Sequence, residues 1–493
     1  MFFTKENIMA LVVFIISIIT FLFWGHNYIT EHYGMFILAT LLGLFMAFNI
    51  GGNDVANSFG TSVGAKTLTI KQALVIAAIF EISGAMLAGG EVTKTIRKGI
   101  VNLDGVTFDP MLFVFVMMGA LTAAGLWLLF ASKKGLPVST THSIVGGIVG
   151  ASLTLGTVVS SPEVSSFDIV NWGKIGMIAA SWVISPLLGG LFSYAIYSYL
   201  KKNILDSNDA KEIEIENAKI EIKTLEKQLE NSNNSESQQL LHSELKIQQY
   251  IVKKSNAFCA IRDHVPIVAA FATSIVAGML LFKGLKKLHF NFNFLETSLM
   301  ILALSTLAYA LTFSLIKVMK KDSPKKATIR LFSILQVFTA SAFAFSHGAN
   351  DIANAIGPFA AVIDVLATGE ISASAPVPMI AMFTFGVALI VGLWFLGKEV
   401  METVGTRLAE IFPVTGFAAE LGASAVILGA TKLGIPVSST HILIGAVLGI
   451  GILNKDANWS LMKPIAMAWV ITLPASALIA SLIFILLKTG FGY

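Results

Sequence analysis

The stretch Gly51–Asn57 reads GGNDVAN within an apolar part of the chain, and a matching stretch, Gly348–Asn354, reads GANDIAN. A second matching pair follows these motifs: Pro137–His142 reads PVSTTH, and Pro436–His441 reads PVSSTH. Carboxylates and carboxamides are costly to place inside a membrane, so their appearance twice in the same order needs a functional reason. The repeated motifs therefore predict that something polar binds between two copies of one structural unit.

The composition is that of a membrane protein. The chain has 493 residues, of which 55% are hydrophobic and 13% charged, and its mean hydropathy is +0.77. Apolar runs of about 17–25 residues recur along it, the length at which a helix spans a bilayer. Thirteen predicted spans cover residues 9–24, 33–50, 70–90, 111–131, 138–158, 172–199, 265–282, 296–318, 332–348, 378–396, 412–431, 436–453 and 463–487. These runs predict an all-α polytopic membrane protein, because barrel strands would be shorter and strictly alternating.

The same residues exclude several classes of function. The single cysteine, Cys259, leaves no internal disulfide framework and no cysteine metal cluster. The net charge of +4 is small, and no nucleic-acid partner is expected. The serine–histidine motifs have neither an acidic orienting residue nor a nucleophile elbow nearby, so an enzyme is not expected. Residues 9–24 lack a small-residue cleavage site after them, which favours a retained helix over a signal peptide.

The spacing of the motifs predicts an inverted repeat. Asp54 and Asp351 lie 297 positions apart, and Pro137 and Pro436 lie 299 apart. Seven predicted crossings separate the two copies, an odd number, so the copies should run in opposite directions. We therefore expect an inverted-repeat helical bundle with interrupted or re-entrant helices at the membrane midplane.

Five segments follow from this division. They are an extra N-terminal transmembrane helix (1–32), a first transmembrane repeat (33–200), a polar insert (201–263), two linking transmembrane helices (264–331) and a second repeat (332–493). The insert should be a charged helical hairpin linked at Asn231–Ser235, or disordered, and its role stays open. Basic residues gather after residue 316, whereas Gly25–His32 has none, which places the N-terminus and the insert on the cytoplasmic side of a cell membrane.

Each copy of the Asn-Asp motif carries oxygen ligands suited to a hard cation. We expect Na⁺ or another hard cation rather than a soft metal, because carboxylate, carboxamide and carbonyl oxygens prefer hard ions. The glycines of Gly51-Gly52 and of His347-Gly348 should break the helix and expose backbone carbonyls. The candidate sodium ligands are Asn53, Asp54, Asn57, Asn350, Asp351 and Asn354.

Each Pro-Val-Ser motif is typical of a helix start, with Pro137 and Pro436 at the first helical position. Free backbone N–H groups and hydroxyls at the positive end of a helix would bind an anion. The candidate anion ligands are Ser139, Thr140, Thr141, Ser438, Ser439 and Thr440, and His142 and His441 should hydrogen-bond within the site. Two lone carboxylates in apolar runs, Glu81 and Glu420, are further functional candidates.

These motifs resemble the inorganic phosphate transporter (PiT) family from about Met35 to the end, outside the insert. The resemblance includes Gly52–Gly60 (GNDVANSFG), Gly348–Asn354, Thr95–Ile100 (TIRKGI), both Pro-Val-Ser motifs and Ala180–Pro186 (ASWVISP). It implies symport of inorganic phosphate with a cation over an inverted-repeat bundle, often as a homodimer in the lipid bilayer. It also implies that the Ser/Thr clusters bind phosphate, and that Glu81 and Glu420 match acids important in the family.

The coupling ion implied by the resemblance is Na⁺, with no other cofactor. Proton-coupled members have His-Asp in the first motif, whereas both copies here keep Asn-Asp-x-Ala-Asn. That makes Asp54, Asn57, Asp351 and Asn354 the implied sodium ligands. The chain departs from the family in Gly52, which replaces the usual Ala, and in the extra helix at 9–24.

Three alternatives stay open at this point. The same site would suit a proton-coupled phosphate permease, or a permease for sulfate or another oxyanion, because hydroxyl donors do not separate tetrahedral anions. From another class, a membrane anion sensor would use the insert for signalling.

Overall fold

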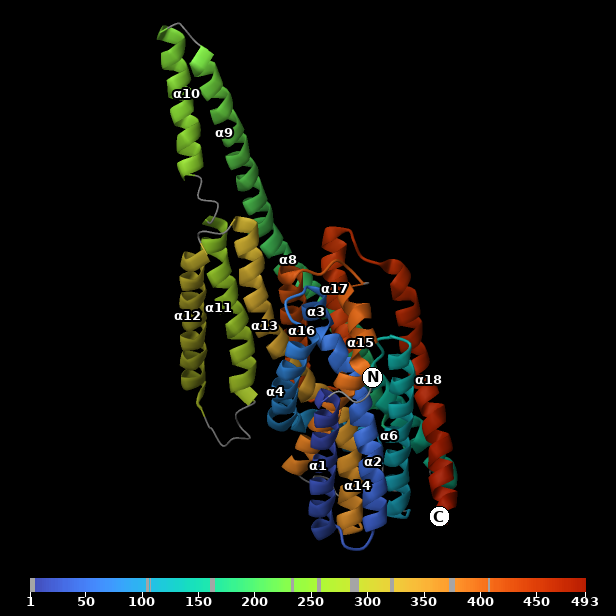
Figure 1. Ribbon diagram of the computed structural model, residues 1–493. Coiled ribbons are helices and arrows are strands. Elements are labelled where there is room, and N and C mark those ends of the chain that lie inside the picture. The colour runs from blue at the N-terminus through green and yellow to red at the C-terminus, as the bar shows by residue number, and fades with distance from the viewer. Residues whose placement is uncertain are drawn as a thin grey trace. The chain divides into compact units, whose positions relative to one another are not determined.

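The computed structural model describes residues 5–102, 106, 108–159, 165–231, 235–254, 259–283, 292–319, 323–371, 377–406 and 408–493. The chain is helical through almost all of these residues, and a single antiparallel bridge joins Val101 and Val170 (Figure 1). The helices are α1 (Lys5–Tyr28), α2 (Tyr33–Ile50), the π-helix η1 (Gly51–Val55), α3 (Ala56–Gly64), α4 (Ile70–Ala88), α5 (Gly90–Lys98), α6 (Pro110–Lys133), α7 (Thr140–Val159), α8 (Trp172–Leu200), the π-helix η2 (Lys201–Leu205), α9 (Asp206–Asn231), α10 (Ser235–Lys254), α11 (Cys259–Lys283), α12 (Phe294–Val318), α13 (Pro324–Asp351), α14 (Ala353–Thr368), α15 (Met379–Thr406), α16 (Pro413–Lys432), α17 (Ser439–Asn454) and α18 (Trp459–Gly490).

Twelve helical stretches in the described ranges are long and apolar enough to cross a membrane. All thirteen predicted spans fall on helices, which confirms the all-α membrane fold class. The prediction of thirteen full spans is wrong for residues 436–453, because α17 has only 16 residues. The apolar run there begins before the helix does, and at about 1.5 Å per residue α17 is shorter than the hydrocarbon core.

The chain divides into two compact units. Unit 1 consists of Met1–Tyr194, Met279–Asn293 and Gln336–Tyr493, and unit 2 of Ala195–Gly278 and Phe294–Leu335. In unit 2, α9 and α10 of the insert lie against each other, with Ala218 and Leu225 of α9 buried. The predicted link of the hairpin falls partly on residues 232–234, which lie outside the described residues. Both pairs of repeated motifs belong to unit 1.

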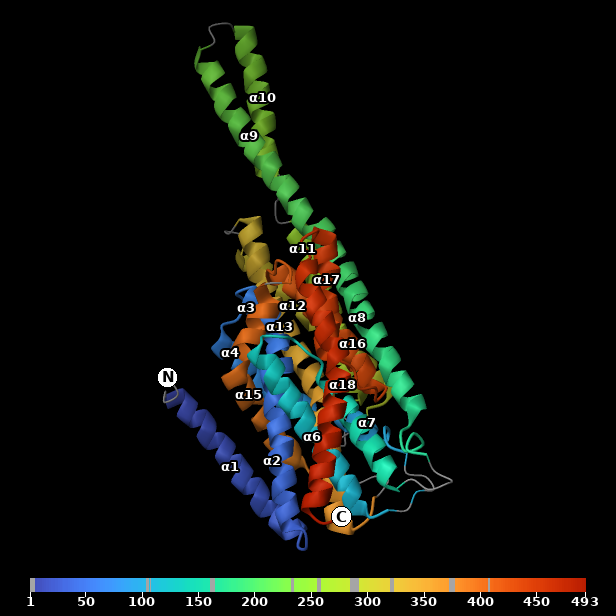
Figure 2. The same ribbon diagram turned by 90° about the vertical axis from the view of Figure 1, so that its right-hand side faces the viewer.

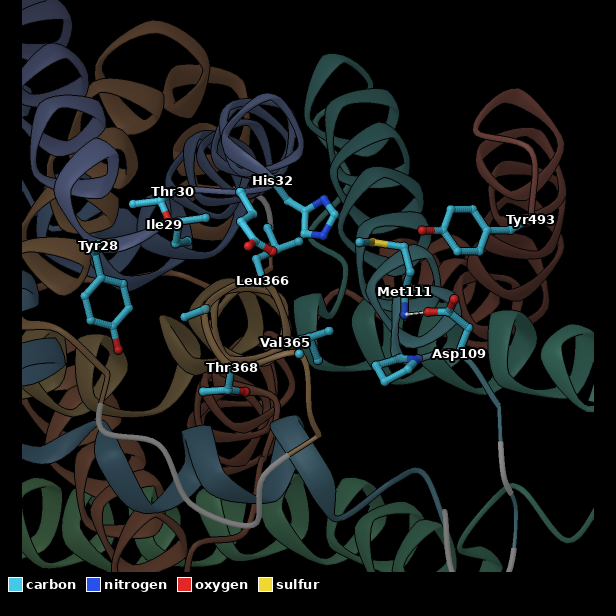
Figure 3. Close-up of a pocket in the computed structure, with 14 residues that line it drawn as sticks. Tyr28, Ile29, Thr30, His32, Asp109, Met111, Val365, Leu366, Thr368 and Tyr493 are labelled. Carbon is cyan, nitrogen blue, oxygen red and sulfur yellow. Dashed lines mark hydrogen bonds between the residues drawn. The ribbon is translucent and has the colours of Figure 1, made fainter.

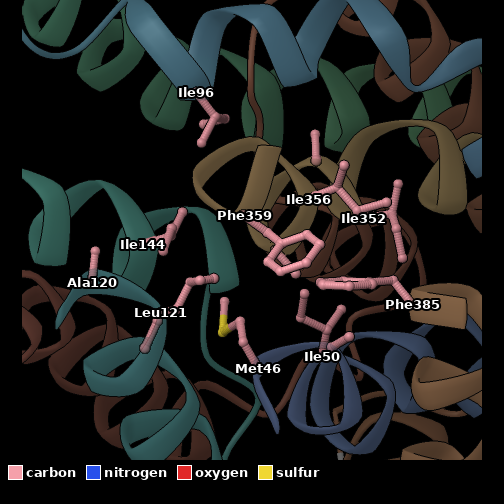
Figure 4. Packing of buried hydrophobic residues seen from close by; sticks show 14 of the residues in the cluster. Met46, Ile50, Ile96, Ala120, Leu121, Ile144, Ile352, Ile356, Phe359 and Phe385 are labelled. Atoms are coloured by element: carbon pink, nitrogen blue, oxygen red, sulfur yellow. The ribbon is translucent and has the colours of Figure 1, made fainter. Parts of the chain in front are cut away.

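Helices from the two halves of the sequence are interleaved in unit 1. Helix α15 packs along α2, η1, α3 and α4, whereas α18 packs on α6 and α7. Figure 4 shows the resulting core, in which Met46 and Ile50 of α2 lie near Phe359 of α14 and Phe385 of α15. The interleaving places residues far apart in the chain around one buried centre.

Glycines at equivalent positions allow two of these close helix contacts. A Cβ atom added to Gly51 would lie 1.7 Å from the carbonyl oxygen of Leu389 on α15. At Gly348 it would lie 2.1 Å from the carbonyl oxygen of Glu81 on α4. Both helices continue through these glycines, so the prediction that they break the helix is wrong. Their role is to let two backbones touch, which no larger residue permits.

The helix irregularity falls on the Asn-Asp motifs themselves. Residues Gly51–Val55 form the π-helix η1, so Asn53 and Asp54 lie in a widened turn between α2 and α3. In the second copy, Ile352 separates α13 from α14, directly after Asp351. Such short irregularities within long helices often mark functional positions, because they redirect side chains and backbone groups.

Candidate functional site

Two asparagines hold the segments that lead into α7 and α17. The Asn53 amide nitrogen donates to Ser132 Oγ (3.1 Å) and to the Leu136 carbonyl (3.0 Å), while its oxygen accepts from Val138 N–H (3.1 Å). Asn350 repeats this pattern in the other half. Its nitrogen donates to Thr431 Oγ1 (3.0 Å) and the Ile435 carbonyl (3.3 Å), and its oxygen accepts from Val437 N–H (3.3 Å).

We call these two sets of hydrogen bonds, made by Asn53 and Asn350, the asparagine clamps. They change where α7 and α17 begin. Helix α7 begins at Thr140 and α17 at Ser439, each three residues after the proline. The prediction that Pro137 and Pro436 occupy the first helical position is therefore wrong. The cause is that Asn53 and Asn350 each accept a hydrogen bond from the backbone N–H of the residue after the proline, which holds that residue outside the helix. The first serines act as N-caps: Ser139 Oγ accepts from His142 N–H (3.1 Å), and Ser438 Oγ from His441 N–H (3.2 Å).

The hydroxyls of the helix starts bond to the aspartates. Asp54 accepts hydrogen bonds from Thr140 Oγ1 and, at 3.1 Å, from Thr440 Oγ1, so it contacts the helix starts of both copies. Asp351 accepts a hydrogen bond from Ser439 Oγ. All five side chains are buried. The two predicted sets of residues, for the cation and for the anion, are thus brought into direct contact.

The second asparagine of each motif reaches across to the other copy. Asn57 donates from its amide nitrogen to Thr440 Oγ1 at 2.8 Å, and Asn354 donates to Thr141 Oγ1 at 3.3 Å. Thr141 Oγ1 in turn donates to the Val437 carbonyl at 2.9 Å, immediately before the other helix start. The two helix starts are therefore held together by reciprocal bonds between the halves.

Three oxygens of this cluster are left without a hydrogen-bond partner within the part of the chain that the structure describes. They are Oδ1 of Asn57, Oδ1 of Asn354 and Oδ1 of Asp351, and all are buried. A buried acceptor without a partner costs about 1–3 kcal/mol, and more when it is charged. Uncharged amide oxygens beside a carboxylate are the ligands that a hard cation prefers, so the donor set fits Na⁺.

His347, expected only as part of a helix break, lies at the centre of the site. His347 Nδ1 lies 2.8 Å from Glu81 Oε2, and its Nε2 lies 2.9 Å from Asp351 Oδ2. Ligand atoms of Asp54, His347 and Asp351 all lie within 4.8 Å of one another. The available signals were the i, i+4 spacing of His347 and Asp351 and the lone acid in the run of Glu81.

The two lone acids take different places. Glu81 joins the site through His347, whereas Glu420 accepts hydrogen bonds in a separate polar cluster. The donors to Glu420 are Thr61 (2.8 Å), Ser62 (2.5 Å), Gln336 (3.2 Å) and Thr339 (2.7 Å). These four neutral donors come from α3 and α13. Glu420 therefore ties the end of the first motif helix to the helix that leads into the second motif.

The two motif histidines lie between tryptophans. The ring centroids of His142 and Trp182 are 3.8 Å apart, those of His441 and Trp469 3.7 Å, and the two histidines meet edge to face at 4.6 Å. Both imidazole rings lie tilted against their tryptophans, at 51° and 32°, and the hydrogen-bonding role expected for His142 and His441 stays a prediction. Trp469 also donates to the Pro137 carbonyl at 3.2 Å, so this aromatic column braces the first helix start.

The polar centre is closed to solvent. A cavity of about 460 Å³ lies at the end of unit 1 where α1 and α14 end and α6 begins. Tyr28, His32, Asp109 and Thr368 line it (Figure 3). None of the predicted site residues is among its lining residues. Because Asp54, Asp351 and the hydroxyl clusters are buried, a ligand can reach them only if the helices move.

The architecture defines a class of protein. A buried polar centre, formed by two copies of one motif within membrane-length helices, is the arrangement of a membrane transporter. The sequence model of the phosphate transporter family matches residues 50–480, which is most of the chain. The chain belongs to the phosphate transporter family.

Relatives and a solved structure agree with this assignment. Two proteins named "Putative phosphate permease" are similar to it: one of Mycobacterium bovis is 49% identical, over 96% of this chain and 91% of its own length. That of Haemophilus influenzae is 35% identical, over 94% of this chain and 100% of its own length. A solved structure named "The sodium-dependent phosphate transporter" superimposes with a TM-score of 0.74 at 31% identity, covering 92% of this chain and 99% of that one.

Proposed function

We propose that this protein is a sodium-coupled phosphate symporter that works by alternating access. One observation carries the proposal: the aspartates of both Asn-Asp motifs bond directly to the hydroxyls of the two helix starts. A cation bound by the aspartates would therefore lie next to an anion bound by the helix starts. The name of the similar solved structure, a sodium-dependent phosphate transporter, supports the choice of ion.

Sodium would bind to Asp54, Asn57, Asp351 and Asn354. The unpartnered oxygens of Asn57, Asn354 and Asp351 support this assignment, since they are buried ligands that no described side chain satisfies. An unpaired aspartate in the membrane costs about 2.5–3.5 kcal/mol on the insertion scale, and a bound cation would offset that cost. Asn53 and Asn350, also expected as ligands, use both amide atoms in the clamps, so we assign them to shaping the site.

Phosphate would bind to Ser139, Thr140, Thr141, Ser438, Ser439 and Thr440. Two helix N-termini supply backbone N–H groups and the positive ends of two helix dipoles, which favour a tetrahedral oxyanion. The hydroxyls now donate to aspartates and carbonyls. Rotation of these hydroxyls toward phosphate oxygens would free the aspartates to bind sodium, which links the binding of the two ions.

We infer that the two halves form an inverted repeat. The reciprocal clamps, caps and cross-bonds support this, and Figure 1 draws α3 and α14, which follow the two motifs, at opposite ends of unit 1. We place the N-terminus and the insert on the cytoplasmic side of the cell membrane. Exposed Lys66→Cys and Ala367→Cys, each in a Cys259→Ser background, should react with impermeant reagents from opposite sides, and labelling from one side only would refute the inverted repeat.

The membrane potential limits the number of sodium ions. Each net charge that moves inward gains about 2.3 kcal/mol per 100 mV. Phosphate carries one or two negative charges at neutral pH, so inward movement of net positive charge needs more than one Na⁺. The two motifs provide two sets of cation ligands, in keeping with this requirement.

Uptake of radioactive phosphate into proteoliposomes tests the proposal. Uptake should require an inward Na⁺ gradient, persist when a proton ionophore removes any pH gradient, and be lost in Asp54→Asn. Sulfate in excess should not compete, since a sulfate permease would be inhibited. Binding of phosphate without flux would instead favour a sensor.

One observation favours a second candidate, coupling to protons. His347 lies between Glu81 and Asp351, and an imidazole between two carboxylates is an arrangement that can move a proton. Uptake that follows the pH gradient and ignores Na⁺ would select this alternative.

A further inference from the structure

A cleft between three membrane helices has no place in the proposed transport mechanism. It has a volume of about 420 Å³ and lies between α8, α17 and α18 in unit 1. The residues that line it are apolar or aromatic, among them Leu187, Leu191, Ile444, Leu448 and Trp459. Leu187, Leu191 and Trp459 are more than 60% exposed, so the cleft opens to the side of the helices.

Glycines form the floor of this cleft, because α8 and α17 have no side chains along the strip where they meet. Gly190, Gly445 and Gly449 all line it. A Cβ atom added at Gly445 would lie 2.3 Å from the Pro186 carbonyl, and one at Gly449 would lie 2.3 Å from the Gly190 carbonyl. Helices α8 and α17 thus touch through their backbones, and the larger side chains on either side of this contact form the walls.

Two lysines lie near one end of the cleft. Ile452, Trp459 and Met462 line this end, where α17 finishes and α18 begins. Lys463 follows Trp459 by four residues on α18, which places it beside a lining residue, and Lys455 is the residue that caps the end of α17, three positions after Ile452. Both lysines are exposed. Asp456, next to Lys455, accepts a hydrogen bond from Glu410 N–H at 3.3 Å, so this end holds charges of both signs.

The other end of the cleft reaches the centre of the transporter. Pro186, Ile444 and Trp469 line it there, and the Trp469 ring lies 3.7 Å from that of His441 and donates to the Pro137 carbonyl. Ile444 lies three residues after His441 on α17. A molecule in the cleft would therefore press on the residues that brace both helix starts.

We propose that this cleft binds an anionic phospholipid, with an acyl chain between α8, α17 and α18 and the headgroup beside Lys455 and Lys463. Apolar walls suit hydrocarbon, and lysines at the end of a membrane helix attract a negative headgroup. Trp459 lies at the same end, where tryptophan is favoured at the boundary between hydrocarbon and headgroups. A second copy of the chain is a less suitable occupant. A helix of that copy would have to fit into the concave cleft, and its apolar surface would offer no negative group to Lys455 and Lys463.

Fluorescence quenching by brominated lipids tests this site. The full chain is reconstituted in phosphatidylcholine with a small fraction of either phosphatidylglycerol or phosphatidylcholine carrying bromine on an acyl chain. Brominated phosphatidylglycerol should quench tryptophan fluorescence at least twice as strongly as brominated phosphatidylcholine at the same fraction. The excess should disappear in Lys455→Gln/Lys463→Gln and fall in Trp459→Phe and in Leu448→Phe, which fills the cleft.

The matched control is Lys219→Gln/Lys223→Gln, which removes two exposed charges from α9 and should keep the full excess. Equal quenching by the two lipids, or equal loss of the excess in the control, would overturn the proposal. So would a chemically cross-linked pair of chains in which Trp459 is protected from both lipids, because the cleft would then be an interface between copies. Each variant is first checked for an unchanged melting profile, so that unfolding is not mistaken for lost binding.

Discussion

Removing the Asn53 side chain tests whether the asparagine clamps shape the site. In Asn53→Ala, the buried Val138 N–H loses its 3.1 Å bond to this side chain, and the partly buried Leu136 carbonyl loses its 3.0 Å bond. The unpaired buried Val138 N–H costs about 1–3 kcal/mol, and the Leu136 carbonyl adds less, so the expected loss is at least about 1–3 kcal/mol. Asn350→Ala removes the equivalent bonds, at 3.3 and 3.3 Å, and should cost less because those bonds are longer.

The clamp also has a functional consequence. If Asn53 positions the start of α7, then Asn53→Ala should weaken the apparent affinities for phosphate and for Na⁺ together. By contrast, replacing a residue that only binds sodium would first raise the Na⁺ concentration needed for uptake. The assay is thermal unfolding in detergent, followed by phosphate uptake at varied Na⁺ and phosphate, normalised to folded protein.

The matched control is Asn49→Ala, four residues earlier on α2, whose amide nitrogen donates to the Phe45 carbonyl of its own helix. It should lose little of either property. The clamp reasoning would be refuted if Asn53→Ala kept both the wild-type melting temperature and wild-type uptake.

Three more predictions follow from other contacts. Arg97 and Asp364 form a buried ion pair 2.5 Å apart, so replacing either one alone should lower the free energy of unfolding by about 3–5 kcal/mol. The double variant Arg97→Met/Asp364→Leu should recover much of that loss in thermal unfolding, and additive losses would contradict this. Gly348→Ala should abolish folding or uptake because its Cβ would lie 2.1 Å from a carbonyl oxygen, whereas Gly429→Ala, with nothing within 4 Å, should express normally; equal expression of the two would argue against the close contact. Glu420→Gln, which replaces an acceptor of four hydrogen bonds, should reduce uptake more than tenfold with folding retained, and unchanged uptake would show that its charge is not needed.

The fold could be predicted from the sequence because its signals are local. The Asn-Asp and Pro-Val-Ser motifs stand out in apolar runs, and their order and spacing define two halves without any tertiary information. Helix boundaries at the motifs could not be predicted in the same way. The first residue of α7 depends on a bond between Val138 and Asn53, 85 positions earlier in the chain.

The partners within the site also depend on tertiary structure. His347 could not be linked to Glu81 from the sequence, because 266 positions separate them and the first copy has Ile50 at the equivalent position. The glycines show the same limit. A pair such as Gly51-Gly52 is compatible with a broken helix or with a close contact, and only the carbonyl of Leu389 at the added Cβ position decides between them.

Sodium and phosphate should move together through the site that the four motifs form. Radioactive sodium and radioactive phosphate should be counted in the same proteoliposomes, at fixed pH and clamped membrane potential. We predict that phosphate stimulates sodium entry, that more than one Na⁺ enters per phosphate, and that both fluxes vanish together in Asp351→Asn. Phosphate entry with no phosphate-dependent sodium entry would contradict the account.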